Sequence, residues 1–439
     1  MKKLLPLFIS AALGGISTSA FADSLAEIYD LAKQNDPQLL SVAAQRDQAF
    51  EAITSSRSAL LPQINLTAGY NLTRGDTEYD SSDSSNDSNA LTADVSFSQA
   101  LYNRASWISL DTAEKNARQA DATYAATQQA LIIRVSQAYF EVLRAQDNLV
   151  FVRAEKAAVG RQLEQTKQRF EVGLSAITDV HDAQAQYDAV LADEVLAEND
   201  LINSYESLRE ITGQEHKDLN ILDTGRFTAN PSTVPAESLI DEAKAKNLTL
   251  LSSRILQDIA RDNISLASSG HLPTLSLDGG YNYSDTSHSS SDNTTDYFTI
   301  GVNLAVPLYT GGNVTSQTKQ AEYAYVAASE ALEAQYRSVV KEVRAQNNNI
   351  NASIGALRAY KQAVISAHSA LEATEAGFDV GTRTIVDVLD ATRRLYDANK
   401  NLSNARYDYI LSVLQLRQAV GTLSEQDILD VDAGLKAAK

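Results

Sequence analysis

The sequence contains an internal duplication, which limits its possible folds more than any other feature. Segment 61–71, which begins with Leu-Pro and ends in Gly-Tyr-Asn, recurs about 210 residues later as segment 272–282. The Phe-Glu-Val-Gly sequence at 170–173 recurs as Phe-Asp-Val-Gly at 378–381. Self-similarity over such a period indicates that one structural unit occurs twice, so we expect two copies of the same set of elements.

The positions of the prolines allow a long helix in each copy. Prolines lie only at positions 6, 37, 62, 231, 235, 273 and 307, and a proline inside a helix would break it. Segments 104–168 and 313–376 are proline-free and have the composition of helices. Apolar residues such as Leu131, Val135 and Val142 recur at helical spacing. Each segment therefore predicts a helix of about 65 residues, roughly 100 Å long.

Each long helix is followed by a reversal of the chain and a second helix. Gly173 and Gly381 lie at the expected reversals, where glycine is a common turn residue. The second helices are expected to end near Gly213 and Gly421, because glycine commonly follows the end of a helix. Each copy therefore predicts a long antiparallel helical hairpin.

Two strands are also expected in each copy. Apolar and polar residues alternate over 64–73 and 90–99 in the first copy, and over 275–283 and 297–306 in the second. The segment between the strands of each pair, at 74–89 and at 284–296, is rich in Ser, Asp, Asn and Thr. Such composition predicts exposed loops in both places.

Strands with one apolar face fit two architectures. Outer-membrane barrels have strands of about 9 to 11 residues, whereas a soluble sandwich can also have one solvated face. Four strands cannot close a membrane barrel, because the smallest known barrels have about eight. A membrane barrel would therefore require strands from several copies of the chain.

Residues 1–22 have the pattern of a signal peptide. Lys2 and Lys3 precede an apolar run, and the small-residue sequence at 20–22 resembles a cleavage site. The apolar run is shorter than the roughly 20 residues that a membrane anchor needs. We therefore expect export, with a mature chain that starts near Asp23.

The composition argues against several classes of protein. The chain has no cysteine, which excludes disulfides and thiolate metal sites. Its net charge of −19 argues against nucleic acid as a partner. The 5 histidines are scattered, and we find no nucleophile elbow or phosphate-binding glycine loop. We therefore expect no enzymatic activity, no metal and no cofactor.

The sequence VGTRTIVDVLDAT at 380–392, with its partner VGLSAITDV at 172–180, resembles the TolC family of outer-membrane efflux proteins. The resemblance covers essentially the whole mature chain. It implies a mainly α-helical fold with a transmembrane β-barrel. The family forms a homotrimer in which a twelve-stranded outer-membrane barrel continues as a long periplasmic α-helical barrel. The implied layout is a first repeat at 23–213, an equatorial linker at 214–247, a second repeat at 248–421 and a C-terminal equatorial tail at 422–439.

The resemblance also implies a function. The family exports drugs, bile salts and other toxic compounds and serves type I protein secretion. It docks with a periplasmic adaptor (membrane fusion protein) and with an inner-membrane efflux or ABC transporter. We therefore expect a channel in the outer membrane, in contact with its lipid and extending into the periplasm. The alternative is a structural coiled-coil or adhesive surface protein, which would not need four strands with apolar faces.

By resemblance, Asp387 and Asp390 form a channel constriction that opens at the periplasmic tip. A spacing of three residues places both carboxylates on one face of a helix, where rings of carboxylates would favour cations. A simpler interpretation of Asp387 is a capping box with Thr384 at the start of a helix. The residue types alone favour this simpler interpretation.

The resemblance assigns the links of the closed state to Thr178, Asp179, Phe378 and Arg383. Arg383 would bond across the tip to Thr178 and hold the entrance closed. The family has a tyrosine where this chain has Phe378, which lacks the hydroxyl needed to donate to Asp179. The closed state is therefore expected to depend on a different set of links here.

The tips that contact the adaptor correspond to Gly173, Leu174, Gly381 and Thr382. Turn formation alone also explains both glycines. The two interpretations are compatible, because a tight turn can also be a docking surface.

Overall fold

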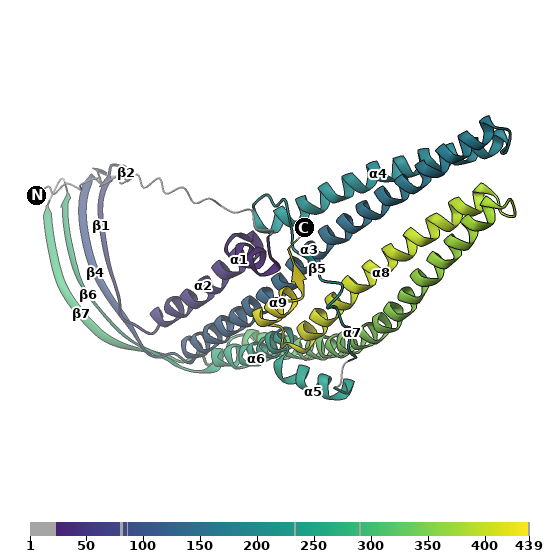
Figure 1. Cartoon of the computed structure of the whole chain (residues 1–439). Coiled ribbons are helices and arrows are strands. Elements are labelled where there is room, and N and C mark those ends of the chain that lie inside the picture. The colour runs from purple at the N-terminus through teal and green to yellow at the C-terminus, as the bar shows by residue number, and fades with distance from the viewer. Residues whose placement is uncertain (1–22, 80–81, 86, 232–233, 289–290, 438–439) are drawn as a thin grey trace, which may run out of the picture.

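The computed structural model describes residues 23–79, 82–85, 87–231, 234–288 and 291–437. A four-stranded sheet lies at one end, and long helices run from it to two hairpin tips at the other end (Figure 1). The predicted signal peptide, residues 1–22, lies outside the described residues.

The sheet joins the two halves of the chain. Its strands pair in the order β1-β4-β6-β7, all antiparallel, and curve along their length (Figure 1). Their bounds are Gln63–Thr73 for β1, Ser88–Tyr102 for β4, Thr274–His288 for β6 and Asp292–Ala305 for β7. The edge strands β1 and β7 are exposed along nearly their whole length, whereas β4 and β6 are largely half-buried.

The register of the sheet places apolar side chains on one face. Leu66 in β1 lies opposite Val95 in β4. Val95 in turn lies opposite Tyr281 in β6, and Tyr281 lies opposite Phe298 in β7. Because residues directly opposite each other share a face, every strand contributes an apolar residue to this row.

Polar side chains occupy the other face, since successive residues of a strand point to opposite sides. Thr67, Asp94 and Asn282 lie opposite one another in the adjacent row, which Tyr297 of β7 completes with its phenol. Further along this face, the hydroxyl of Ser98 donates to Asp278 at 2.7 Å and links β4 to β6. The sheet therefore has one apolar and one polar surface.

The prediction of exposed loops at 74–89 and 284–296 is wrong for part of each segment. β2 (Asp76–Tyr79) and β3 (Ser82–Ser85) form a hairpin inside the first segment. β4, β6 and β7 also extend into the two segments. Strands are paired by backbone hydrogen bonds, which Ser, Thr, Asn and Asp form as other residues do, so a polar composition did not end the strands.

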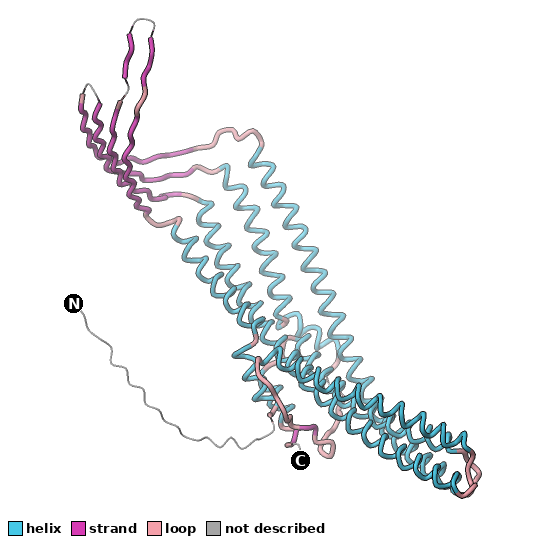
Figure 2. The backbone as a smooth tube through the Cα atoms, turned by 90° about the horizontal axis from the view of Figure 1, so that it is seen from above, coloured by secondary structure: helices cyan, strands magenta, loops and turns pink. Residues whose placement is uncertain are grey.

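Long helices continue from the sheet to the tips (Figure 2). The two longest are α3, with 68 residues, and α7, with 67. The bounds of the long helices are α2 Pro37–Ser58, α3 Arg104–Glu171, α4 Ile177–Thr212, α6 Leu248–Ser268, α7 Asn313–Asp379 and α8 Ile385–Val420. No helix within the described ranges is both long and apolar enough to cross a bilayer.

The second helix of each hairpin ends at a glycine in the left-handed conformation. Gly213 follows α4 with φ of 71°, and Gly421 follows α8 with φ of 87°. At Gly421 a Cβ would also lie 2.4 Å from the carbonyl oxygen of Lys246. Both the backbone angle and the packing therefore require glycine at this position.

A small mixed region surrounds the middle of the helices. Its elements are α1 (Leu25–Asn35), β5 (Ile221–Leu222), α5 (Ala236–Lys246), α9 (Glu425–Asp432) and β8 (Leu435–Lys436), whereas the short helix η1 (Ser269–His271) lies between α6 and β6 beside the sheet. β5 pairs with β8 and so ties the end of the first half to the end of the chain. This region encloses the largest buried cluster, which is centred on Tyr139 and Phe140 of α3.

Helices α3 and α8 are joined at this core. The rings of Phe140 and Tyr407 lie 5.5 Å apart, and the Tyr407 hydroxyl donates to Asp147 at 2.8 Å. Burial, together with the charge of Asp147, raises the pKa of Tyr407, so the phenol keeps its proton and remains a donor. The two halves of the chain are thus fastened together midway between the sheet and the tips.

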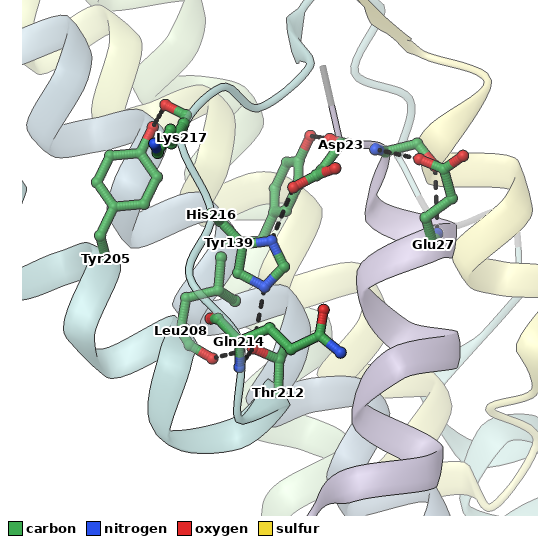
Figure 3. Close-up of polar contacts among 10 residues, drawn as sticks. Asp23, Glu27, Tyr139, Tyr205, Leu208, Thr212, Gln214, His216 and Lys217 are labelled. Carbon is green, nitrogen blue, oxygen red and sulfur yellow. Dashed lines mark hydrogen bonds and ion pairs between the residues drawn. The ribbon is translucent and has the colours of Figure 1, made fainter. Parts of the chain in front are cut away.

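Asp23 is held in the same region by a buried histidine (Figure 3). Nδ1 of His216 lies 2.7 Å from the Asp23 carboxylate, and Nε2 lies 2.9 Å from the hydroxyl of Thr212. The Asp23 backbone N–H donates to the carbonyl of Asp218 at 2.9 Å. These contacts fasten the start of the described chain beside the end of α4.

Replacing His216 with alanine is expected to lower the melting temperature of the purified protein. The imidazole is 3% exposed, and its loss leaves Asp23 without this partner, whereas the Thr212 hydroxyl keeps its hydrogen bonds to the backbone of Leu208 and Gln214. An unpaired buried polar group costs about 1–3 kcal/mol. Asp23 is 41% exposed and can be rehydrated, so the effect should lie near the lower end. Thermal unfolding followed by circular dichroism measures it, with the exposed His181→Ala as the control, and equal melting temperatures for both variants would contradict the expectation.

Candidate functional site at the hairpin tips

The two hairpin turns have the same backbone geometry. Gly173 and Gly381 have φ of 77° and 79°. The N–H of Leu174 donates to the Arg169 carbonyl, and the N–H of Thr382 donates to the Gly377 carbonyl, both at 2.8 Å. This is the helix ending that glycine favours. The predicted tip residues Gly173, Leu174, Gly381 and Thr382 therefore all lie in the two turns and are exposed.

Apolar side chains at both tips face solvent. Val172 is 70% exposed, Leu174 72% and Val380 75%. A cluster of such residues at the far end of a long hairpin is unusual for a surface without a partner.

An aspartate carboxylate caps the start of the second helix of each hairpin, and at α8 the hydroxyl of Thr384 also accepts from the Asp387 N–H, which completes a capping box. The carboxylate of Asp387 accepts from the N–H and the hydroxyl of Thr384, both at 2.9 Å. Asp179 does the same for α4, accepting from the N–H of Ala176 at 3.2 Å and the hydroxyl of Ser175 at 2.7 Å. The interpretation of Asp387 as a helix cap is therefore confirmed.

The cap affects the charge of Asp387. Hydrogen bonds from the Thr384 N–H and hydroxyl, with a smaller contribution from Arg383, hold the pKa of Asp387 below its usual range. A lowered pKa means that the capping contact is fully present above the ordinary range for aspartate and is lost as the pH falls through the lowered value. Asp387 is therefore negatively charged at neutral pH.

Asp390 lies one turn further along α8 and takes no part in the cap. Its carboxylate is 3.7 Å from the guanidinium of Arg393, and both side chains are at least half exposed. An exposed pair of this kind is weak, so Asp390 remains accessible to ions. A substitution of Asp390 therefore leaves the helix cap formed by Asp387 in place.

Phe378 and Asp179 do not contact each other through a hydrogen bond. The ring of Phe378 is 9% exposed and lies under the guanidinium of Arg169, whose Cζ is 4.6 Å from the ring centre. Arg169 also pairs with Asp379 at 3.6 Å. Arg169 was not among the residues predicted from the sequence. The sequence signal for it is a difference between the two copies of the duplicated unit, because the position of Arg169 is occupied by Gly377 in the second copy.

Thr178 and Arg383 lie at the starts of the two second helices. The hydrogen bonds of the described residues include none between these two side chains within one chain. The Arg383 stem instead packs on Gly377, where an added Cβ would lie 2.8 Å from Cγ of Arg383. The predicted link between Arg383 and Thr178 therefore stays a prediction.

The described residues include no cluster of His, Cys, Asp and Glu suited to a metal ion. The tip instead combines apolar turns, capped helix starts and a carboxylate pair on one helix face. This arrangement offers binding surfaces and charge and contains no nucleophile paired with a base.

Comparison with known proteins identifies the class. The chain matches the model of the outer membrane efflux protein family over residues 28–214 and 239–422, and it belongs to this family. It is therefore a protein of the outer membrane that functions in efflux, and it is not an enzyme. The resemblance to the TolC family is confirmed.

Individual relatives extend the match over the whole chain. The outer membrane protein TolC of Vibrio cholerae serotype O1 is 76% identical over 443 residues, covering 100% of both chains. The alkaline protease secretion protein AprF of Pseudomonas aeruginosa is 29% identical and covers 98% of this chain and 90% of its own. The solved CmeC outer membrane channel of Campylobacter jejuni has the same fold, with a TM-score of 0.78 at 16% identity, covering 99% of this chain and 98% of that one. The mainly helical fold of an outer-membrane efflux channel is thus confirmed.

Proposed function

We propose that three copies of this chain form one continuous export duct through the outer membrane. The observation that carries the proposal is the sheet, which has one apolar face, one polar face and two free edges. An unpaired sheet edge is not viable in lipid, and a closed membrane barrel needs at least about eight strands. Pairing of β7 of one copy with β1 of the next closes a barrel of twelve strands around the polar face.

The helices would continue this barrel into the periplasm. In this arrangement 23–213 and 248–421 are the two repeats, each of which contributes two strands and one hairpin. The linker at 214–247 and the tail at 422–439 would form the belt around the middle. Support comes from the pairing of β5 with β8, which brings the linker and the tail together.

The proposed cargo is chemically diverse. We assign to the duct the efflux of drugs, bile salts and other toxic compounds, and type I protein secretion. The name of AprF, an alkaline protease secretion protein, supports the secretion of proteins. A duct supplies no selectivity pocket of its own, so the choice of cargo would lie with the inner-membrane transporter.

The tips would dock the periplasmic adaptor, which in turn connects the duct to an inner-membrane efflux or ABC transporter. Gly173, Leu174, Gly381 and Thr382 form the proposed contact. The exposure of Leu174 and of the neighbouring Val172 and Val380 supports an apolar partner surface there.

Asp387 and Asp390 would form two carboxylate rings at the entrance, each repeated three times around the axis. Like charges held close together attract cations and resist the passage of anions. Thr178, Asp179, Phe378 and Arg383 would restrain the entrance in its closed state, with the Arg383 link to Thr178 made between neighbouring hairpins.

Cells that lack this protein are expected to become sensitive to several chemically unrelated toxic compounds at once, because one duct would serve several pumps. Growth inhibition by a panel of detergents, dyes and antibiotics measures the effect. Reintroduction of the wild-type gene should restore resistance. Unchanged sensitivity across the panel in a strain with active pumps would contradict the proposal.

A further inference from the structure

We propose that Arg169 is a positioning residue that latches the two hairpins of one chain together at their tips. The inference rests on the proposed function of the tips as the entrance of a duct. Arg169 lies in the last turn of α3, while its two partners, Phe378 and Asp379, lie in the last turn of α7. We call these three residues the tip latch.

Two contacts hold the latch in a defined geometry. The guanidinium lies over the face of Phe378, with Cζ 4.6 Å from the ring centre, within the range of a cation–π interaction. Nη1 of the same guanidinium lies 3.6 Å from the carboxylate of Asp379. The Arg169 side chain is 25% exposed, which is lower than expected for an arginine in free solvent. The cation is therefore held between a ring and a carboxylate of the other hairpin.

Phe378 links the latch to the packing beneath it. The ring is 9% exposed and belongs to an apolar cluster that also contains Val159 and Leu163 of α3, and Ile385 and Val388 of α8. This cluster contains residues of both hairpins. Because Arg169 packs on the ring of Phe378, the latch adds a charged contact to an interface that is otherwise apolar.

The duplication makes the latch specific to one pairing of hairpins. Arg169 of the first copy corresponds to Gly377 of the second, and Phe378 corresponds to Phe170, which is 41% exposed. Gly377 cannot carry a cation, and a Cβ at this position would collide with the stem of Arg383. The first copy therefore supplies the cation, and the second copy supplies the buried ring.

The latch supplies a polar contact to Phe378 that Asp179 cannot make. The Asp179 carboxylate accepts from Ser175 and from the N–H of Ala176 in its own turn, and Phe378 has no hydroxyl to donate to it. Arg169 is the residue that joins Phe378 to the first hairpin through a charged group. Breaking the latch should free the α7–α8 tip to move away from α3.

Distances between the tips test the latch directly. The chain has no cysteine, so Leu174→Cys and Thr382→Cys give two unique exposed sites for spin labels. In the labelled protein, Arg169→Gln is expected to lengthen and broaden the distance distribution measured by electron–electron double resonance. Loss of a cation–π contact should raise the ratio of open to closed tips by about 2- to 30-fold. The conductance of the unlabelled variant in planar bilayers should rise with it.

Arg153→Gln is the matched control. Arg153 lies on the same helix, but it pairs with Glu194 and Glu198 of its own hairpin and does not bridge to the other one. The control should keep the distances and conductance of the parent. Arg169→Lys, which retains the charge but not the planar group, should lie between the parent and Arg169→Gln.

A second variant protects the test against a failure to fold. Phe378→Leu keeps an apolar side chain in the cluster and removes the ring, so it should reproduce the effect of Arg169→Gln. The double variant should add little to either single change, because both remove the same contact. Parent-like distances in both Arg169→Gln and Phe378→Leu would overturn the latch, even if the parent conducts ions. If the parent protein does not conduct ions, the proposed export duct is refuted. The distance measurement would still show whether Arg169 holds the two tips together.

Discussion

Arginine at Leu66, Val95 or Val302 is expected to prevent the protein from assembling in the outer membrane. All three positions belong to the apolar face of the sheet, and Leu66 and Val302 are 72% and 64% exposed in the single chain. An arginine that faces lipid near the midplane of the bilayer costs roughly 2 to 4 kcal/mol. In a trimer each substitution occurs three times, so the total approaches the roughly 5–15 kcal/mol that stabilises a typical fold.

The measurement is the amount of folded oligomer in the outer-membrane fraction, detected as a band that shifts on heating before gel electrophoresis. Thr67→Arg and Asn303→Arg are the matched controls, because they lie on the polar face of the same strands. These controls should assemble nearly as well as the parent. Equal tolerance of arginine on both faces would rule out a membrane barrel with this register.

Replacing both Asp387 and Asp390 with alanine is expected to weaken cation selectivity and block by multivalent cations. The change would remove all carboxylates of the two proposed rings, and with them their negative potential at the entrance. Bilayer recordings under a salt gradient measure the selectivity, and added trivalent cations measure the block.

Arg383→Ser should instead raise conductance with little change in selectivity, because it removes a restraint and leaves the rings in place.

Asp387 and Asp390 differ in their contribution to the helix cap, so the proposed constriction can be tested apart from the cap. Asp387 accepts two hydrogen bonds from Thr384, whereas Asp390 takes no part in the capping box. Asp390→Asn should therefore reduce selectivity without affecting the start of α8. Thr384→Ala removes the capping hydroxyl and keeps both carboxylates, so it should destabilise the start of α8 and retain selectivity. Unchanged selectivity and block in the double alanine variant would contradict the carboxylate rings and would show that Asp387 acts only as a helix cap.

Most of the fold follows from local patterns in the sequence. The strand predicted at 64–73 forms at Gln63–Thr73, because its alternation of apolar and polar residues is strict. The helices at 104–168 and 313–376 form because the segments contain no proline and few glycines. The strands in the polar segments were missed, since their pairing depends on the backbone and leaves little trace in composition.

The candidate site was predictable to the extent that it is local. The turn glycines and the capping box of Asp387 involve residues a few positions apart, and short motifs describe them well. The contact between Arg169 and Phe378 joins residues from the two copies of the duplicated unit. The contact between His216 and Asp23 is likewise distant in sequence. Such pairs depend on how the elements pack, which periodicity does not specify.

Several copies of this chain are proposed to complete one channel. The most direct test records the purified protein in a planar lipid bilayer and determines the mass of the same oligomer. We expect a mass of three subunits and discrete single-channel steps in current. A stable monomer in the mass measurement, or an oligomer that produces no current across the bilayer, would contradict this proposal.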